Sequence, residues 1–293
     1  MPRTVALEGQ GSMGGTEDGE VNEGLTPVLA RPPIPQYLAD VWARREFIVT
    51  VPVNQLRASN MDTLLGNFWF LVNPALQTLV YFLIFGVMLK IDRGIDNYLS
   101  FLVIGVLTFT FFTTAMTAAA RCMQANLTLI RSMYFPRAAI PISSLLANLY
   151  TFLPSLLIMV VLVLLTGGGL TWRWAVLPPI LALIFVMALG IVFIIARVGK
   201  AVPDLHALLP HVLRLLFYGS GVLFAPARFT SNEAVLWIFY ANPLYEVLVL
   251  TRWSLLGRPM EWFIPWMAVG WASAIVMFGA WFFWRGETSY GNA

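Results

Sequence analysis

The sequence predicts an all-α integral membrane protein with six transmembrane helices, an N-terminal interfacial amphipathic helix and a re-entrant external helix pair before the last span. Two observations support this prediction. Hydrophobic residues make up 59% of the 293-residue chain and charged residues only 11%, whereas a soluble domain has about 25% charged residues. The hydrophobic residues also gather in six runs between residues 68 and 284, each near the roughly 20 residues that a helix needs to cross a bilayer.

The chain divides into three parts. Residues 1–35 hold five carboxylates among many glycines and end in a proline cluster, a composition typical of a disordered acidic tail. Residues 36–64 predict an interfacial amphipathic helix and a loop leading into the first span, with Trp42 at the depth of the lipid headgroups. An ordinary packed helix is the alternative interpretation of this second part. Residues 65–293 form the transmembrane domain.

The six predicted spans set the topology. They cover residues 68–89, 98–120, 140–166, 174–196, 205–224 and 263–284. Twelve of the 18 Lys and Arg residues fall on one side of these spans, which is the side of both termini. Because cytoplasmic segments of membrane proteins are enriched in Lys and Arg, we expect a multi-pass protein of the inner (plasma) membrane with both termini cytoplasmic. An even number of spans also requires both termini to lie on the same side.

One apolar segment does not fit a simple span. Residues 233–253 are apolar enough to enter the bilayer, but Asn242-Pro243 interrupts them and Glu246 follows. A charged residue in the middle of a membrane helix costs roughly 2.5 to 3.5 kcal/mol on insertion. We therefore predict a re-entrant pair of half-helices with Asn242, Pro243 and Glu246 at an external gate; a seventh span is the alternative. Glu246 and Arg252 either line this gate or form a salt bridge.

The segment between the second and third spans carries the most suggestive local pattern. It lies on the positively charged side, and Pro136 ends a short helix there, because the residue before a proline is pushed out of the helical region. Tyr134 and Phe135 would then form an apolar knob between Arg131 and Arg137. Aromatic and Arg side chains are frequent anchors of protein contacts. The segment either docks in a groove on a partner or lies against lipid as an interfacial loop.

Several motifs along the chain resemble one family of membrane proteins. They are Leu65-Gly66 with Trp69 and Asn73-Pro74, then residues 126–136, then Asp204-Leu205, and last residues 217–224 followed by Asn242-Pro243. In order and spacing they are similar to the motifs of ABC-2 type permeases that export cell-surface polysaccharides, above all lipid-linked O-antigen permeases and galactan exporters. The resemblance implies that residues 126–137 are a coupling helix that docks on an ATPase. Its contact residues would be Asn126, Leu129, Ile130, Arg131, Tyr134, Phe135, Pro136 and Arg137.

The resemblance implies a half-transporter with a role in cell wall biogenesis. Two copies would form a homodimeric channel in membrane lipid, and two copies of a separate nucleotide-binding ATPase, with ATP and Mg, would dock below it. The sequence has no G-x-x-x-x-G-K-[ST] phosphate-binding loop, so we expect no enzyme activity and no cofactor in this chain. The substrate would be a lipid-pyrophosphate-linked polysaccharide of the O-antigen or galactan type, moved from the cytoplasm across the inner membrane. No nucleic acid partner is expected.

Two groups of residues are candidates for contact with this substrate. Arg pairs well with phosphate, and aromatic rings stack on the flat C–H faces of sugars. The predicted substrate entrance consists of Arg44, Arg45, Arg57, Leu65, Gly66 and Trp69, and the predicted channel aromatics are Phe109, Phe111, Phe112, Phe217 and Tyr218. The alternative is that the arginines anchor the cytoplasmic side and that the aromatic residues pack in the core or at the membrane interface.

Other functions fit parts of the pattern. An ABC-2 permease for teichoic acid, for capsule or for a small amphiphile such as a drug would have similar spans. A membrane-embedded enzyme needs acidic or His clusters, and a secondary transporter needs a carboxylate well inside a span; the predicted spans contain neither. His206 and His211 lie five residues apart, which does not suit a helical metal pair, and the single Cys122 excludes a disulfide within the chain. No metal site is therefore expected.

Overall fold

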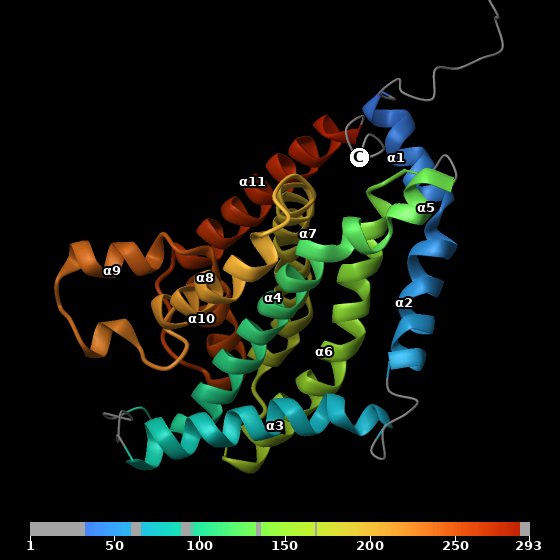
Figure 1. Ribbon diagram of the computed structural model, residues 1–293. Coiled ribbons are helices and arrows are strands. Elements are labelled where there is room, and N and C mark those ends of the chain that lie inside the picture. Colours follow the sequence, from blue (N-terminus) through green and yellow to red (C-terminus); the bar gives the residue numbers. More distant parts are fainter. Residues whose placement is uncertain are drawn as a thin grey trace, which may run out of the picture. The chain divides into compact units, whose positions relative to one another are not determined.

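The computed structural model describes residues 33–59, 66–88, 95, 97–132, 136–167 and 169–287. They belong to one of the chain's two compact units, Arg31–Ala293. Every regular element in this part of the chain is helical (Figure 1). The elements are α1 (Ile34–Ala43), α2 (Arg45–Ser59), η1 (Gly66–Phe68), α3 (Trp69–Tyr81), the π-helical η2 (Phe82–Met88), α4 (Tyr98–Ala125), α5 (Leu127–Ser132), α6 (Ala139–Leu165), η3 (Trp172–Val176), α7 (Leu177–Ala201), α8 (Leu205–Gly219), η4 (Pro226–Arg228), α9 (Glu233–Tyr240), α10 (Pro243–Leu256) and α11 (Ile264–Arg285).

Five helices of the described chain are long and apolar enough to cross a bilayer. They are Leu71–Met88, Tyr98–Ala125, Ala139–Leu165, Trp172–Ala201 and Ile264–Arg285. These helices coincide with the first four predicted spans and with the last one. The number rises to six if the bent pair α9–α10 is counted as one span. The protein is thus an all-α integral membrane protein, as the hydropathy of its sequence predicts.

The fifth predicted span ends earlier than expected. The prediction over residues 205–224 is wrong at its C-terminal end, because α8 has 15 residues and stops at Gly219. At about 1.5 Å per residue it is roughly 22 Å long, shorter than a hydrocarbon core of about 30 Å. The apolar run continues into a buried turn in which Gly221 has a φ of +62°. A Cβ at Gly221 would also lie 3.0 Å from the ring of Tyr245, so the turn depends on glycine at this position.

The predicted interruption at Asn242-Pro243 is present. The axes of α9 and α10 differ by 88° across it, and the Asn242 side chain caps α10 by accepting a hydrogen bond from the backbone N–H of Leu244 at 3.0 Å. Pro243 takes the first position of α10, where its missing N–H costs nothing. An angle of this size is the geometry of a broken span or of a re-entrant pair, and it agrees with the predicted split.

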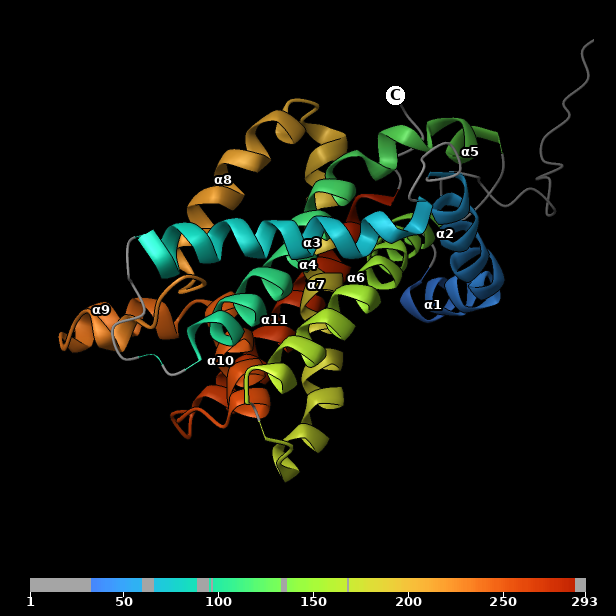
Figure 2. The same cartoon turned by 90° about the horizontal axis from the view of Figure 1, so that it is seen from below.

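α4 is the central helix of the bundle. It packs against α6, α7, α8 and α10, and α3 crosses α4 and α6 in both views (Figure 1, Figure 2). α7 and α11 make the most extensive helix contact of the described chain, and Gly190 and Gly279 bring their backbones together. A Cβ at Gly279 would collide with the carbonyl oxygen of Gly190. Small residues allow this approach, from which membrane helices gain van der Waals contact and hence stability.

The predicted amphipathic helix is in fact two helices. α1 and α2 meet at a turn on Arg44, and α2 packs along α6. The apolar side of the pair is buried against the bundle, since Tyr37 and Ile48 share a core cluster with Met123 and other residues of α4, α7 and α11. Trp42 is 71% exposed, and its position at the headgroups remains a prediction. Within the acidic tail predicted for residues 1–35, only residues 33–35 are described.

Candidate functional site

The predicted coupling segment is described in part. Asn126 ends α4, and its side-chain amide donates to the carbonyl of Cys122 at 2.8 Å. α5 follows, with Leu129 half-buried and Ile130 buried in the same core cluster as Tyr37. Tyr134 and Phe135, together with the side chain of Arg131, lie outside the described residues, so the apolar knob remains a prediction.

The far end of this segment is held by a buried carboxylate that sequence analysis missed. Pro136 is buried, and Glu287 accepts a hydrogen bond from the backbone N–H of Arg137 at 3.2 Å. Glu287 also accepts from the Tyr37 hydroxyl at 2.8 Å, and that hydroxyl accepts from the N–H of Ala138 at 3.1 Å. Burial raises the pKa of Glu287, and its hydrogen bonds to Tyr37 and Arg137 oppose this shift. The carboxylate therefore joins α1, the start of α6 and the residues after α11.

The predicted channel aromatics divide between cavity and core. Phe109 and Phe217 meet edge to face at 5.2 Å between ring centroids, and Tyr81, which sequence analysis did not single out, stacks on Phe217 at 5.3 Å. Tyr218 is 47% exposed. Phe112, in contrast, is completely packed in the core, as the alternative interpretation of the aromatic residues requires.

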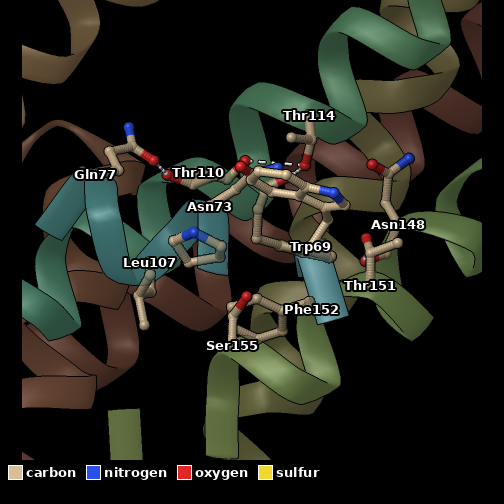
Figure 3. Close-up of a pocket in the computed structure, with 12 residues that line it drawn as sticks. Trp69, Asn73, Gln77, Leu107, Thr110, Thr114, Asn148, Thr151, Phe152 and Ser155 are labelled. Carbon is tan, nitrogen blue, oxygen red and sulfur yellow. Dashed lines mark hydrogen bonds between the residues drawn. The ribbon is translucent and has the colours of Figure 1, made fainter. Parts of the chain in front are cut away.

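Phe111 lines the larger of two neighbouring pockets. This pocket, the α3–α4–α6 pocket, has a volume of about 300 Å³. Its lining residues are Trp69, Asn73, Pro74, Gln77, Leu107, Thr110, Phe111, Thr114, Asn148, Thr151, Phe152 and Ser155 (Figure 3). Apart from the Trp69 indole, the polar side chains of this pocket carry hydroxyl or amide groups, and none of the lining residues is charged. Figure 3 shows the Trp69 side chain among the polar side chains of Thr114, Asn148 and Thr151.

The second pocket, the α3–α4–α8 pocket, has a volume of about 240 Å³ and shares Gln77 and Thr110 with the first. Its lining residues are Gln77, Tyr81, Phe109, Thr110, Thr113, Thr117, Pro210, Leu213, Arg214, Phe217 and Tyr218. The predicted aromatics Phe109, Phe217 and Tyr218 thus face one cavity. The two pockets adjoin along α4 because they have lining residues in common.

A stripe of threonines on α4 connects the two pockets. Thr110, Thr113, Thr114 and Thr117 recur at helical spacing on one face. Three of their hydroxyls donate to carbonyls one turn back, at 2.7 to 3.1 Å. A hydroxyl that donates to its own helix keeps lone pairs that accept hydrogen bonds from a ligand. The period of the threonines is visible in the sequence, and it is the signal that could have revealed this surface.

The described members of the predicted substrate entrance lie on different elements. Arg44 and Arg45 are exposed at the junction of α1 and α2, and α2 runs from this junction to the other end of the bundle (Figure 1). Gly66 begins η1 and Trp69 lines the α3–α4–α6 pocket. Leu65 and the side chain of Arg57 lie outside the described residues. Among the described members of this group, Trp69 is the one that lines a pocket together with polar residues of α4.

The predicted gate residues have unequal roles. Asn242 caps α10 and donates to the Ser220 hydroxyl at 3.0 Å, which ties α10 to the turn after α8. Glu246 is fully buried, and neither oxygen of its carboxylate has a hydrogen-bond partner among the described residues. Arg252 donates instead to the backbone carbonyls of Gly221, Val222 and Phe101. A Glu246–Arg252 salt bridge, one of the two alternatives for this pair, is absent, because residues six apart on a helix point about 120° away from each other.

The described residues contain no group of three or more His, Cys, Asp and Glu side chains that could hold a metal ion. The candidate site is a mostly uncharged and partly aromatic surface, in which Arg214 of the α3–α4–α8 pocket is the one charged side chain among the described lining residues. Most of this surface offers weak hydrogen bonds and ring contacts to a ligand.

Comparison with known proteins identifies the family. The ABC-2 type transporter family matches residues 54–256. The O-antigen export system permease protein RfbA of Myxococcus xanthus is 24% identical over 241 residues, which are 82% of this chain and 92% of the relative. RfbA of Klebsiella pneumoniae is 26% identical over 71% of this chain and 79% of the relative, and the polysialic acid transport protein KpsM of Escherichia coli is 25% identical over 64% and 72%. With most of its length matched, and with its bundle of apolar helices, this chain belongs to the ABC-2 type transporter family.

Proposed function

We propose that this protein is the permease subunit of an ATP-driven exporter that moves a lipid-pyrophosphate-linked polysaccharide, of the O-antigen or galactan type, out of the cytoplasm. The observation that carries this proposal is the pair of adjoining pockets on α4, lined by hydroxyls, amides and aromatic rings. The names of the relatives, which export O-antigen and transport polysialic acid, favour the same class of substrate.

The chemistry of these pockets suits a sugar polymer. Each sugar unit presents hydroxyl groups that both donate and accept hydrogen bonds, as Thr, Asn and Gln side chains do. Aromatic residues such as Trp69 and Phe217 offer flat faces for the C–H surfaces between those hydroxyls. Because a neutral hydrogen bond contributes only about 0.5 to 1.5 kcal/mol, no single contact holds the polymer fast. A long chain can therefore advance from one set of contacts to the next.

The power for export would come from other chains. The sequence contains no phosphate-binding loop for a nucleotide. We propose that two copies of this protein form the channel, and that two copies of an ATPase subunit with bound ATP and Mg dock on residues 126–137. Both termini and this segment would then face the cytoplasm, where Arg44, Arg45 and Arg57 would receive the pyrophosphate of the lipid carrier.

A capsule-type polymer is the second candidate, because one relative is named for polysialic acid transport. Teichoic acid export and export of a small amphiphile such as a drug are further alternatives. A drug site is expected to be mostly apolar. Seven of the twelve side chains that line the α3–α4–α6 pocket carry a hydroxyl or amide group, and a mostly apolar drug would leave these groups without partners.

Depletion of the protein in its host tests the proposal. We expect lipid-linked glycan to accumulate inside the cell, measured by mass spectrometry of extracted lipid-linked sugars, while the surface polymer decreases. Re-expression of the unaltered protein should reverse both changes. Normal glycans combined with an altered tolerance to drugs would refute polysaccharide export and favour the small-amphiphile alternative.

A further inference from the structure

One guanidinium lies in the α3–α4–α8 pocket. Arg214 of α8 lines this pocket, and its side chain is exposed. The described residues that line the two pockets on α4 include no Asp and no Glu. A single positive charge is thus set into a surface that is otherwise uncharged, and contact with sugar hydroxyls alone does not account for it.

The wall beside Arg214 is an aromatic surface. Tyr218 follows Arg214 by about one helical turn and lines the same pocket. The ring of Phe217 meets that of Tyr218 edge to face at 5.5 Å between centroids, and it stacks on the ring of Tyr81 at 5.3 Å. These contacts restrict the orientation of the rings. A ligand bound by Arg214 would therefore lie against flat apolar faces as well.

The pocket lies at the middle of the bundle and not at either end. Of its lining residues, Thr113 and Thr117 are near the middle of α4, and Gln77 and Tyr81 are in the central part of the span Leu71–Met88. Because the side chains around it come from the middle of two spans, Arg214 lies at the depth of the hydrocarbon. A charged side chain at this depth is costly unless it faces water or protein, and such residues mark the pathways of substrates and ions.

The protein offers Arg214 little counter-charge at this depth. Among the described residues, no hydrogen bond, ion pair or ring contact to its guanidinium is present. The five spans and α8 contain no Asp or Glu, so the same helices of a second copy cannot supply a carboxylate either. On the bent pair α9–α10, Glu233 is the first residue of α9 and Glu246 is fully buried. The charge of Arg214 is thus left for a ligand to balance.

We propose that Arg214 contacts the diphosphate of the lipid-linked glycan as this group passes through the bundle. The inference rests on the proposed function and adds the residue that recognises the charged part of the substrate. Arg donates paired hydrogen bonds to phosphate oxygens, and such charge-assisted bonds are the strong ones. The hydroxyls of Thr113, Thr117, Tyr81 and Tyr218 line the same cavity, so the sugar next to the diphosphate finds hydrogen-bond partners there.

The presence of one charge favours a diphosphate over acidic sugar units as the source of the anion. A polymer with an acidic repeat would bring a new carboxylate to Arg214 at every step, and each would be held there. A diphosphate passes once. The rest of the glycan then meets the uncharged parts of the two pockets, where each contact is weak. Arg214 would therefore distinguish the charged end of the substrate from its neutral body.

Binding to the purified full-length protein in lipid nanodiscs tests this role. The probes are a neutral disaccharide on polyprenyl diphosphate, the same disaccharide on polyprenol without phosphate, and a phosphate-free probe whose disaccharide carries a carboxylate. Arg214→Gln should raise the Kd for the diphosphate probe about tenfold, which is about 1.4 kcal/mol, and leave the Kd for the neutral probe unchanged. Arg214→Lys keeps the charge and should restore most of the affinity. His211→Gln is the matched control, since His211 is exposed on the same helix and lines neither pocket on α4.

The possible failures can be told apart. Equal Kd values for the diphosphate probe in Arg214→Gln and His211→Gln would overturn the inference and leave the proposed function standing. An equal loss of affinity for the diphosphate and the neutral probe would show that Arg214 supports the packing of α8, which also refutes it. A loss confined to the carboxylate probe would exclude the diphosphate as the source of the anion. If the unaltered protein binds none of the glycan probes, the proposed function fails and the inference fails with it.

Discussion

The Tyr37 hydroxyl donates a hydrogen bond to Glu287 across 250 residues of sequence, at 2.8 Å. The same carboxylate accepts from the backbone of Arg137, the last residue of the segment predicted to dock on an ATPase. One buried side chain thus connects the N-terminal helix, the start of α6 and the end of α11. Any movement of the docking segment must either carry these three elements with it or break these hydrogen bonds.

Replacement of Glu287 should destabilise this junction. Glu287→Ala leaves the Tyr37 hydroxyl and the Arg137 N–H without their acceptor in a buried place, at a cost of about 1 to 3 kcal/mol. We expect a lower midpoint of thermal unfolding in detergent micelles. Glu46→Ala, at an exposed position of α2, is the control and should leave the midpoint nearly unchanged. Equal midpoints for the two variants would contradict the role of Glu287.

The same carboxylate should make stability depend on pH. Its pKa in the folded protein is raised above the ordinary value of 4.5 by burial, so the folded protein binds the proton more tightly than the unfolded chain does. The stability that this proton contributes is complete below pH 4.5 and is lost as the pH rises through the folded pKa. As the pH is raised from 4.5, the free energy of unfolding of the unaltered protein should decrease more than that of Glu287→Gln. Parallel curves for the two proteins would exclude Glu287 as the source.

The threonine stripe should contribute to transport and little to folding. Thr114→Val keeps the shape of the side chain and removes a hydroxyl from the α3–α4–α6 pocket. Loss of one neutral hydrogen bond should lower export about threefold to tenfold, measured as surface polymer at matched protein levels. Thr108→Val is the control on the same helix, because the buried Thr108 hydroxyl has no hydrogen-bond partner in the described part of the chain and lines neither pocket on α4. Similar export by both variants would argue against the stripe as a substrate surface.

The contact between α7 and α11 should tolerate no side chain. In Gly279→Val the added carbons collide with the backbone of Gly190, and overpacking costs about 1 to 3 kcal/mol or more. We expect little monodisperse protein in size-exclusion chromatography after extraction with detergent. Gly270→Val, on the same helix but facing open space, should behave as the unaltered protein does. A normal elution profile for Gly279→Val would show that the helices are not closely packed.

The sequence by itself determined where the chain enters the membrane. Apolar runs of sufficient length predict the spans at residues 68–89, 98–120, 140–166, 174–196 and 263–284, and helices cover all five. Asn242-Pro243 likewise predicts the break between α9 and α10. Transfer of apolar residues into hydrocarbon and the missing N–H of proline are local effects, so they can be read from neighbouring residues alone.

Only the tertiary structure decided which side chains meet. Phe109 and Phe112 look alike in the sequence, yet one lines a cavity and the other is packed in the core. Glu246 and Arg252 look like an ion pair, yet Arg252 binds carbonyls of α4 and of the turn after α8. These outcomes depend on how α4 and α10 rotate about their axes against neighbours distant in sequence. Hydropathy fixes the depth of a helix in the membrane, but packing between helices fixes the direction of each face.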